Sequence, residues 1–191
     1  GLGTMIHEML HMFGAVDLYD VHSDVPSSDW SGVGAWDIMA SGNWNGNGRT
    51  PALPTSGTLD LIGANEPLDL PIGTLGPADN ESYTILPHVA SAGTVRIAIA
   101  PGEYIWMESR IDQGFDRDLP AHGLLVTHEN RNFADFEHNE VNRDPEHAYL
   151  KVIEADGDAS LENSLPDEDP GDIFTSGSFG ADGIQIRDGH G

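Results

Sequence analysis

One short stretch near the start of the chain constrains the fold more than any other. It runs from His7 to Asp17 and reads HEMLHMFGAVD. If this stretch is helical, His7 and His11 lie one turn apart on the same face, where two imidazoles can bind one metal ion. Gly14 can then end the helix, because glycine readily adopts the left-handed conformation that reverses the chain. The reversal would return Asp17 to the same metal as a third ligand.

The same stretch contains a candidate catalytic base, Glu8, directly after the first histidine. Two histidines and one carboxylate leave the fourth position of a zinc ion open, which is typical of a catalytic rather than a structural site. Glu8 could then act on a water molecule in that position. The neighbouring residues are apolar on nearly all sides, which predicts a buried helix whose polar side chains need partners. Histidines that are simply hydrogen-bonded in a core are the other interpretation.

The composition limits the classes of partner. The 191 residues suffice for one large domain or two small ones, and 32 acidic against 8 basic residues give a formal net charge of −24. Such a charge argues against nucleic acid and anionic membranes as partners. It suits a secreted protein, a calcium-binding protein or simple solubility. The chain has no cysteine, and therefore no disulfide or thiolate chemistry, and the sequence has no apolar run of membrane-spanning length.

Residues 34–44 carry a second motif, GAWDIMASGNW. A methionine among aromatic residues is ordinary core composition. Together with a zinc motif that ends in aspartate, however, this stretch resembles the metzincin metallopeptidases of the immune inhibitor A type, the cholerilysins. In that family a tight turn with a methionine forms a hydrophobic floor beneath the metal and reads much like Trp-x-x-Met-x-Ser-Gly-x-Trp. Snapalysins share the terminal aspartate, so the later motifs decide. The matching positions are Trp36, Met39, Ser41, Gly42 and Trp44.

Later segments extend the resemblance intermittently to about residue 180. Residues 103–128 are similar to a family block with the elements Glu-Tyr, Glu-x-Arg, Gly-Phe-Asp, Leu-Pro, Gly-Leu-Leu and His. Residues 154–157 and 171–174 are similar to the family's Glu-Ala-Asp-Gly and Gly-Asp-x-Phe segments. The chain departs from the pattern at Ala64, where the family has a tryptophan at the end of a helix, and this departure leaves the end of the catalytic subdomain unmarked.

These features predict an α+β fold. Residues 1–66 are expected to form a metzincin-like lower catalytic subdomain, with the active-site helix and the Met-turn, and residues 67–191 a β-rich antiparallel subdomain. The strands are expected at 83–86, 94–100, 104–109, 123–127 and 148–154, where short β-prone runs alternate with proline and glycine. Because the active-site helix lies so close to Gly1, we expect the chain to begin inside a domain, without the upstream sheet subdomain. Apolar residues such as Ile6 and Leu10 would then be exposed.

Other side chains are interpreted more simply. The interval 18–35 is predicted as a surface loop, in which His22 and Asp24 are possible extra ligands but are better explained as solvated residues. The polar loop 43–48 could bind calcium through its oxygens, although a simple turn also explains it. Glu108 and Arg110 alternate on a predicted strand and form a structural pair. His128 could line the cleft, but is interpreted as a core histidine at a strand end.

The resemblance implies a secreted zinc-dependent metalloendopeptidase that hydrolyses peptide bonds in proteins. His7, His11 and Asp17 would hold Zn²⁺, Glu8 would act as general base on a zinc-activated water, and Met39 would be the Met-turn methionine. The upstream catalytic subdomain of the same polypeptide would be a partner, and the chain alone would be inactive. Two alternatives stay open. The chain could be an incomplete or non-catalytic module that binds a metal or a partner, or an acidic calcium-binding domain with an accidental zinc motif.

Overall fold

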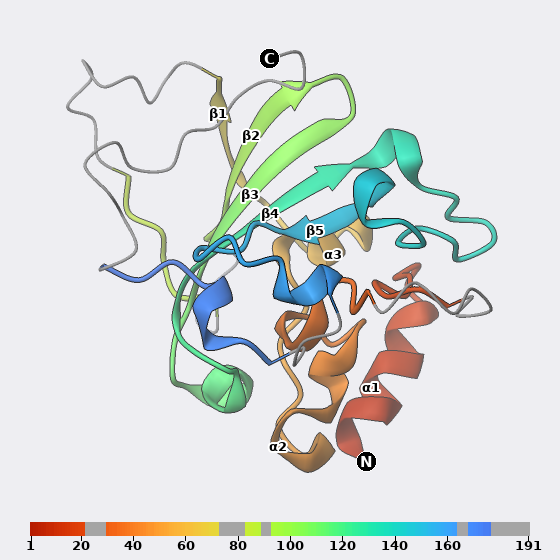
Figure 1. Cartoon of the computed structure of the whole chain (residues 1–191), viewed down its shortest axis with the longest axis vertical. Helices are drawn as coiled ribbons and strands as arrows, with labels where there is room; N and C mark the ends of the chain where they lie inside the picture. The colour runs from red at the N-terminus through yellow and green to blue at the C-terminus, as the bar shows by residue number, and fades with distance from the viewer. Residues whose placement is uncertain (22–29, 73–82, 89–92, 164–167, 177–191) are drawn as a thin grey trace.

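The protein has a mixed α+β fold built around a five-stranded mixed sheet with few helices, which agrees with the predicted class (Figure 1). The structure is a computed structural model that describes residues 1–21, 30–72, 83–88, 93–163 and 168–176. The strand order is β1-β2-β3-β4-β5, in which β1 is parallel to β2 and the other neighbours are antiparallel. The strands are β1 Leu68–Pro71, β2 Val95–Ala100, β3 Glu103–Arg110, β4 Gly123–Asn130 and β5 Leu150–Val152.

The described helices are short. The α-helices are α1 Leu2–His11, α2 Asn45–Gly48 and α3 Ser56–Leu61. The 3₁₀-helices are η1 Gly34–Trp36, η2 Ser41–Trp44, η3 Gly114–Asp118, η4 Arg131–Phe133, η5 Pro145–His147, η6 Ser160–Glu162 and η7 Pro170–Asp172. Figure 1 shows α1 and α2 beside each other, away from the loop that joins β2 to β3. None of the described helices is long and apolar enough to cross a membrane.

The predicted strands are largely confirmed, with two exceptions. Strands β2 to β5 coincide with four of the predicted runs, although β4 is longer and β5 shorter than expected. The run at 83–86 is not a strand, and only Pro87 beyond it forms an isolated bridge, with Ser109. A proline has no N–H group, so it cannot continue a ladder of hydrogen bonds. Strand β1 was not predicted. It is four residues long and ends in Pro71, which is tolerated because β1 lies at a sheet edge.

Two apolar clusters cover the opposite faces of the sheet. Because side chains alternate along a strand, Leu125 in β4 packs into the larger cluster and Val126 into the smaller one. The larger cluster takes residues from both predicted domains. It includes Leu18, Trp36 and Met39 from the first part and Leu125, Tyr149 and Leu150 from the second. The first part of the chain is therefore packed directly on the sheet, while the division at residues 66 and 67 stays a prediction.

A buried arginine attaches β3 to the first part of the chain. Arg110 is fully buried and donates hydrogen bonds to Glu108 and Asp116, each with an N–O distance of 2.7 Å. It also donates to the backbone carbonyls of Trp36 at 3.1 Å and Leu53 at 3.2 Å. The structural pairing of Glu108 with Arg110 is confirmed, and the network holds the segment after Trp36 against the sheet.

Helix α1 is buried along one face only, so the prediction of a buried helix is wrong. Gly3 and His7 are buried, while Ile6 and Leu10 pack partly buried against the larger cluster, contrary to the expectation that they would be exposed. Gly3 permits this packing, because a Cβ atom there would lie 1.9 Å from the carbonyl oxygen of Asn43. The opposite face carries exposed apolar side chains, which we call the outer stripe. The outer stripe consists of Leu2, Met5, Met9, Met12 and Phe13.

Candidate metal centre

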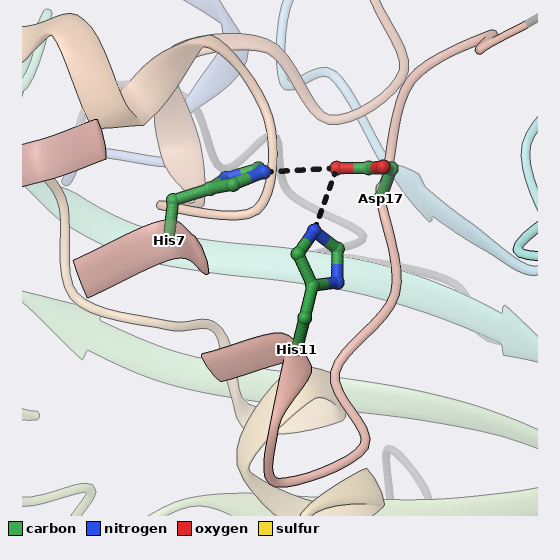
Figure 2. Close-up of side chains that lie close together, drawn as sticks. All are labelled: His7, His11 and Asp17. Carbon is green, nitrogen blue, oxygen red and sulfur yellow. Dashed lines mark ion pairs between the residues drawn. The ribbon is translucent and has the colours of Figure 1, made fainter. Parts of the chain in front are cut away.

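The chain reverses after α1 at the predicted glycine. Gly14 has a φ of +97°, in the left-handed region that favours glycine. The Gly14 N–H donates to the carbonyl of His11 at 3.0 Å, and the Ala15 N–H donates to the carbonyl of Leu10 at 3.2 Å. These two bonds are the Schellman pattern of a helix end. The reversal brings Asp17 back beside the helix, where its carboxylate faces both histidines (Figure 2).

Three potential ligand atoms converge in front of α1. Asp17 Oδ1 lies 3.0 Å from His7 Nε2 and 3.4 Å from His11 Nε2, and the three atoms lie within 4.8 Å of one another (Figure 2). In a tetrahedral zinc site with metal–ligand bonds of about 2.1 Å, neighbouring ligand atoms are about 3.4 Å apart. The observed separations are thus close to those that a metal ion of this size requires.

Hydrogen bonds on the far side of both imidazoles determine which nitrogen faces the carboxylate. His7 Nδ1 lies 2.8 Å from the Ile38 carbonyl oxygen, and His11 Nδ1 lies 2.8 Å from the Ala15 carbonyl oxygen. A carbonyl oxygen can only accept, so both Nδ1 atoms carry a proton. In the neutral rings each Nε2 then presents a lone pair. Metal-binding histidines nearly always have a second-nitrogen partner of this kind.

The convergence of these atoms is favourable when a cation lies between them. Asp17 is 8% exposed, and its Oδ1 atom is buried without a hydrogen-bond donor when both histidines are neutral. Three lone-pair atoms at one point repel one another unless a proton or a metal ion lies between them. The residues present therefore fit a bound metal, with a proton on His7 as the substitute in the metal-free protein.

The pKa shifts at the centre agree with a proton that takes the place of the metal ion. The hydrogen bond to Asp17 is the main cause that raises the pKa of His7, although burial opposes it. Burial alone would raise the pKa of Asp17, but hydrogen bonds from His7 and Asn139 and the charge of His11 together lower the pKa below its ordinary value. Burial, followed by the Asp17 charge, raises the pKa of Tyr19 to about 12. Tyr19 thus keeps its proton and can donate it in a hydrogen bond to Asp17.

The segment with Met39 is hydrogen-bonded to residues of the centre and to their neighbours in the chain. Buried Asp37 accepts hydrogen bonds from the Met39 N–H and from the hydroxyl groups of Thr55 and Thr58, all at 2.7 Å, which fixes the turn. The Met39 carbonyl accepts from the N–H of Leu18 at 2.9 Å. Met39 itself is fully buried. The turn therefore contacts the chain next to Asp17 and, through Ile38, the imidazole of His7, while the role of Met39 as a floor beneath a metal stays a prediction.

Glu8 lies on the exposed side of the centre. Its side chain is exposed on α1, and its charge contributes to raising the pKa values of both His7 and Tyr19. Tyr19, whose pKa is raised by burial and by the charges of Asp17 and Glu8, also lines a cavity of about 250 Å³. The cavity is lined by Tyr19, Ser31, Ala40, Ser41, Asn43 and Trp44. Tyr19 is therefore the residue that connects the centre to this cavity.

The other predicted residues lie apart from this centre or outside the description. His22 and Asp24 fall outside the described residues. The surface-loop prediction is wrong for residues 30–35, which are mostly buried against the larger cluster. His128 is not a core histidine, because its side chain is 31% exposed and its Nε2 atom lies 2.7 Å from Glu103 Oε1.

The loop 43–48, for which the sequence allows both calcium binding and a simple turn, turns sharply in the structure. Gly46 and Asn47 both have positive φ values, and Asn45 donates a hydrogen bond to the Ala35 carbonyl at 3.0 Å. A polar cavity of about 490 Å³ opens beside this loop, with Asp118 and Glu168 in its lining. Exposed or half-exposed Glu154, Asp156 and Asp158 also lie together elsewhere. Calcium binding stays a prediction, since exposed acidic groups are common without an ion.

Asn139 is a side-chain contact of the centre that sequence reasoning missed. It lies on the connection between β4 and β5 and is hydrogen-bonded to Asp17, which is 122 residues away in the sequence. An isolated asparagine in a polar loop carries no local signal of such a role, so only the fold could reveal it.

Comparison of the chain with protein-family models, with curated proteins and with solved structures found no match. The resemblance to the immune inhibitor A family therefore depends on the motifs of this sequence, and the chemistry of the site must be argued from its own side chains.

Proposed function

We propose that the chain is the zinc-binding part of a secreted metalloendopeptidase, similar to the immune inhibitor A type of metzincin, that cleaves peptide bonds in proteins. The observation that carries this proposal is the convergence of His7 Nε2, His11 Nε2 and Asp17 Oδ1, with both histidine Nδ1 atoms bound to backbone carbonyls. Three protein ligands would leave the fourth position of a tetrahedral zinc ion open, which is the arrangement that distinguishes catalytic from structural zinc sites.

The donor set favours zinc over the other common divalent ions. Imidazole nitrogens suit zinc and neighbouring transition metals, whereas calcium and magnesium prefer sites made of oxygen atoms. A centre with His7, His11 and Asp17 offers two imidazoles and a single carboxylate. A bound zinc ion would polarise the scissile carbonyl and lower the pKa of a coordinated water.

The side chains around the centre would then transfer protons and bind the substrate. Glu8 is next to His7 and exposed, so it can accept a proton from the attacking water and pass it to the leaving amine. Tyr19 keeps its phenolic proton and can donate it to Asp17, which would help to hold this ligand. The cavity of about 250 Å³ is smaller than typical sites for whole small molecules and suits one side chain of a peptide.

The outer stripe of α1 supports a further part of the proposal. Met5 is 56% exposed, Met9 50% and Met12 85%. Exposed apolar side chains gathered on one face of a helix are typical of an interaction site. We propose that a sheet subdomain of the same polypeptide covers the stripe and forms the second wall of the substrate cleft, which makes that subdomain the partner of residues 1–191.

The exposed stripe also favours a second candidate function. A metal centre next to an apolar surface would serve equally well in a non-catalytic module that binds a partner protein. The two functions differ in whether Glu8 is required for activity, because only the peptidase needs a general base.

The test compares Glu8→Gln with His11→Ala in a polypeptide that contains the sheet subdomain. Glu8→Gln should keep about one zinc per chain by elemental analysis, while casein cleavage falls by about 10²- to 10⁴-fold for loss of the general base. His11→Ala, as the control, should lose both zinc and cleavage. A fully active Glu8→Gln variant would refute the catalytic role, and stoichiometric zinc in His11→Ala would refute the site. Zinc binding without cleavage by the parent protein would identify the binding module.

A further inference from the structure

The connection between β4 and β5 forms a wall of the metal centre. It folds back on itself through an isolated antiparallel bridge between Asp135 and Glu140. Next to this bridge, half-buried Asn139 has a φ of +56°, in the left-handed region that asparagine tolerates better than most residues. This turn places the Asn139 side chain against Asp17.

Asn139 contacts Asp17 at two points. Its Oδ1 atom accepts a hydrogen bond from the Asp17 backbone N–H at 2.7 Å, and its Nδ2 atom donates one to Asp17 Oδ2 at 2.6 Å. The two partners fix the orientation of the amide, because a backbone N–H can only donate and an ionised carboxylate can only accept. One oxygen of the carboxylate is thereby occupied, and the other, Oδ1, is left facing the two histidines.

A second asparagine holds the connection in place independently. Asn142 is 1% exposed, and its Nδ2 atom donates to the carbonyls of Leu18 at 3.1 Å and Leu150 at 2.8 Å. Its Oδ1 atom accepts from the Leu150 N–H at 3.1 Å. The residue after Asp17 is thus tied to β5, so the backbone near Asn139 should keep its place even when the Asn139 side chain is removed.

We propose that Asn139 is a positioning residue for the metal centre, which orients Asp17 so that Oδ1 is presented to the metal before it binds. The inference rests on the proposed zinc site and extends it to a residue far away in the sequence. Hydrogen bonds that orient a metal ligand typically change metal affinity by about 10- to 100-fold when they are lost.

Asn139→Gly separates this role from the left-handed backbone. Glycine adopts a positive φ without strain, so the variant keeps the turn and removes only the side-chain contacts. Asn139→Asp keeps an acceptor for the Asp17 N–H but places a second carboxylate against Asp17 Oδ2. A matched control is Asn132→Gly, because exposed Asn132 lies on the same connection and contacts Pro101 and Asn130 instead of Asp17.

The experiment measures zinc affinity by competition with a chromophoric chelator. We expect about 10- to 100-fold weaker binding for Asn139→Gly, weaker binding still for Asn139→Asp, and an unchanged affinity for Asn132→Gly. The visible spectrum of bound Co²⁺ should change in Asn139→Gly and stay unchanged in the control. If Asn139→Gly binds zinc as tightly as the parent and only unfolds at a lower temperature, Asn139 is a structural residue and the inference is overturned while the zinc site stands.

A measurement on the metal-free protein keeps the inference separate from the proposed function. The NMR signals of the Asn139 side-chain amide should shift strongly in Asp17→Ala, because the acceptor at 2.6 Å is removed. An unchanged amide signal would overturn the inference. A parent protein that binds no zinc, but shows this shift, would refute the proposed metal site and leave the contact between Asn139 and Asp17 established.

Discussion

At the scale of single residues, a proton and the proposed zinc ion would compete for the same three atoms. Both histidine Nδ1 atoms are held by carbonyls, so a proton that binds His7 in the metal-free protein must occupy Nε2, the position that faces Asp17. Asp17 raises the pKa of His7 above its ordinary value of 6.5. Zinc binding must displace this proton, because a histidine ligand has to be neutral.

The affinity for zinc should therefore rise with pH and continue to rise above pH 6.5. The metal-free protein should behave in the opposite way. A raised pKa means that the protonated pair stabilises the fold below about pH 6.5 and that this stability is lost as the pH rises through the higher folded-state pKa of His7. Zinc titrations and thermal unfolding of the metal-free protein across this range test both trends. In Asp17→Asn, which lacks the carboxylate, the dependence of unfolding on pH should weaken. A zinc affinity of the parent protein that does not change above pH 6.5 would contradict a raised pKa of His7.

At the scale of elements, Arg110 of strand β3 connects the sheet to Trp36, in the segment next to the candidate metal centre. Arg110→Met would leave Glu108 and Asp116 buried without their cation. Removing one partner of a buried ion pair typically destabilises a protein by about 3–5 kcal/mol. We expect a loss of this size in urea unfolding.

The control for this substitution is Arg117→Ala. The Arg117 side chain is 60% exposed and lies 3.6 Å from Asp118, so its removal should change the stability by less than about 1 kcal/mol. Equal stabilities of the Arg110→Met variant and the parent protein would show that the two carboxylates find water or a proton in place of the arginine.

The elements that sequence reasoning predicted are those with a strong local pattern. The chain reversal at Gly14 after α1 and the strands β2 to β5 follow from glycine conformation and from β-prone runs. Strand β1 was missed because four residues ending in Pro71 show little periodicity, and its parallel pairing with β2 depends on a partner 27 residues later. The apolar residues of α1 predicted burial, but which face is covered depends on packing partners that a helical pattern does not specify.

In the candidate site, too, the residues with a local pattern were predicted and those that depend on the fold were not. His7, His11 and Asp17 lie within one short stretch, so their spacing alone predicts that they form one site. The groups that orient them are backbone carbonyls and a distant amide. Ile38 is 31 residues from His7, and Asn139 is 122 residues from Asp17. No residue type in the sequence distinguishes these positions, because a carbonyl group is present at every residue and Asn139 acts only through its place in the fold.

At the scale of the whole molecule, the covered and exposed faces of α1 have opposite consequences. The inner face packs against the core next to His7, so the three ligands are held by contacts within the described part of the chain. Residues 1–191 alone should therefore bind zinc. The outer stripe is exposed. If no other part of the protein covers the outer stripe, a substrate bound at the centre would be enclosed on one side and open on the other.

Residues 1–191 alone should consequently show little or no peptidase activity even with zinc bound, and a sheet subdomain supplied covalently or as a second chain should restore it. A casein assay on both forms tests this expectation. Replacing Met5, Met9 and Met12 together by glutamine keeps good helix formers and removes apolar surface, so it should leave zinc affinity unchanged and prevent the restoration. Robust, chelator-sensitive cleavage by residues 1–191 alone would show that the centre needs no second wall, and the outer stripe would then have to serve a different partner.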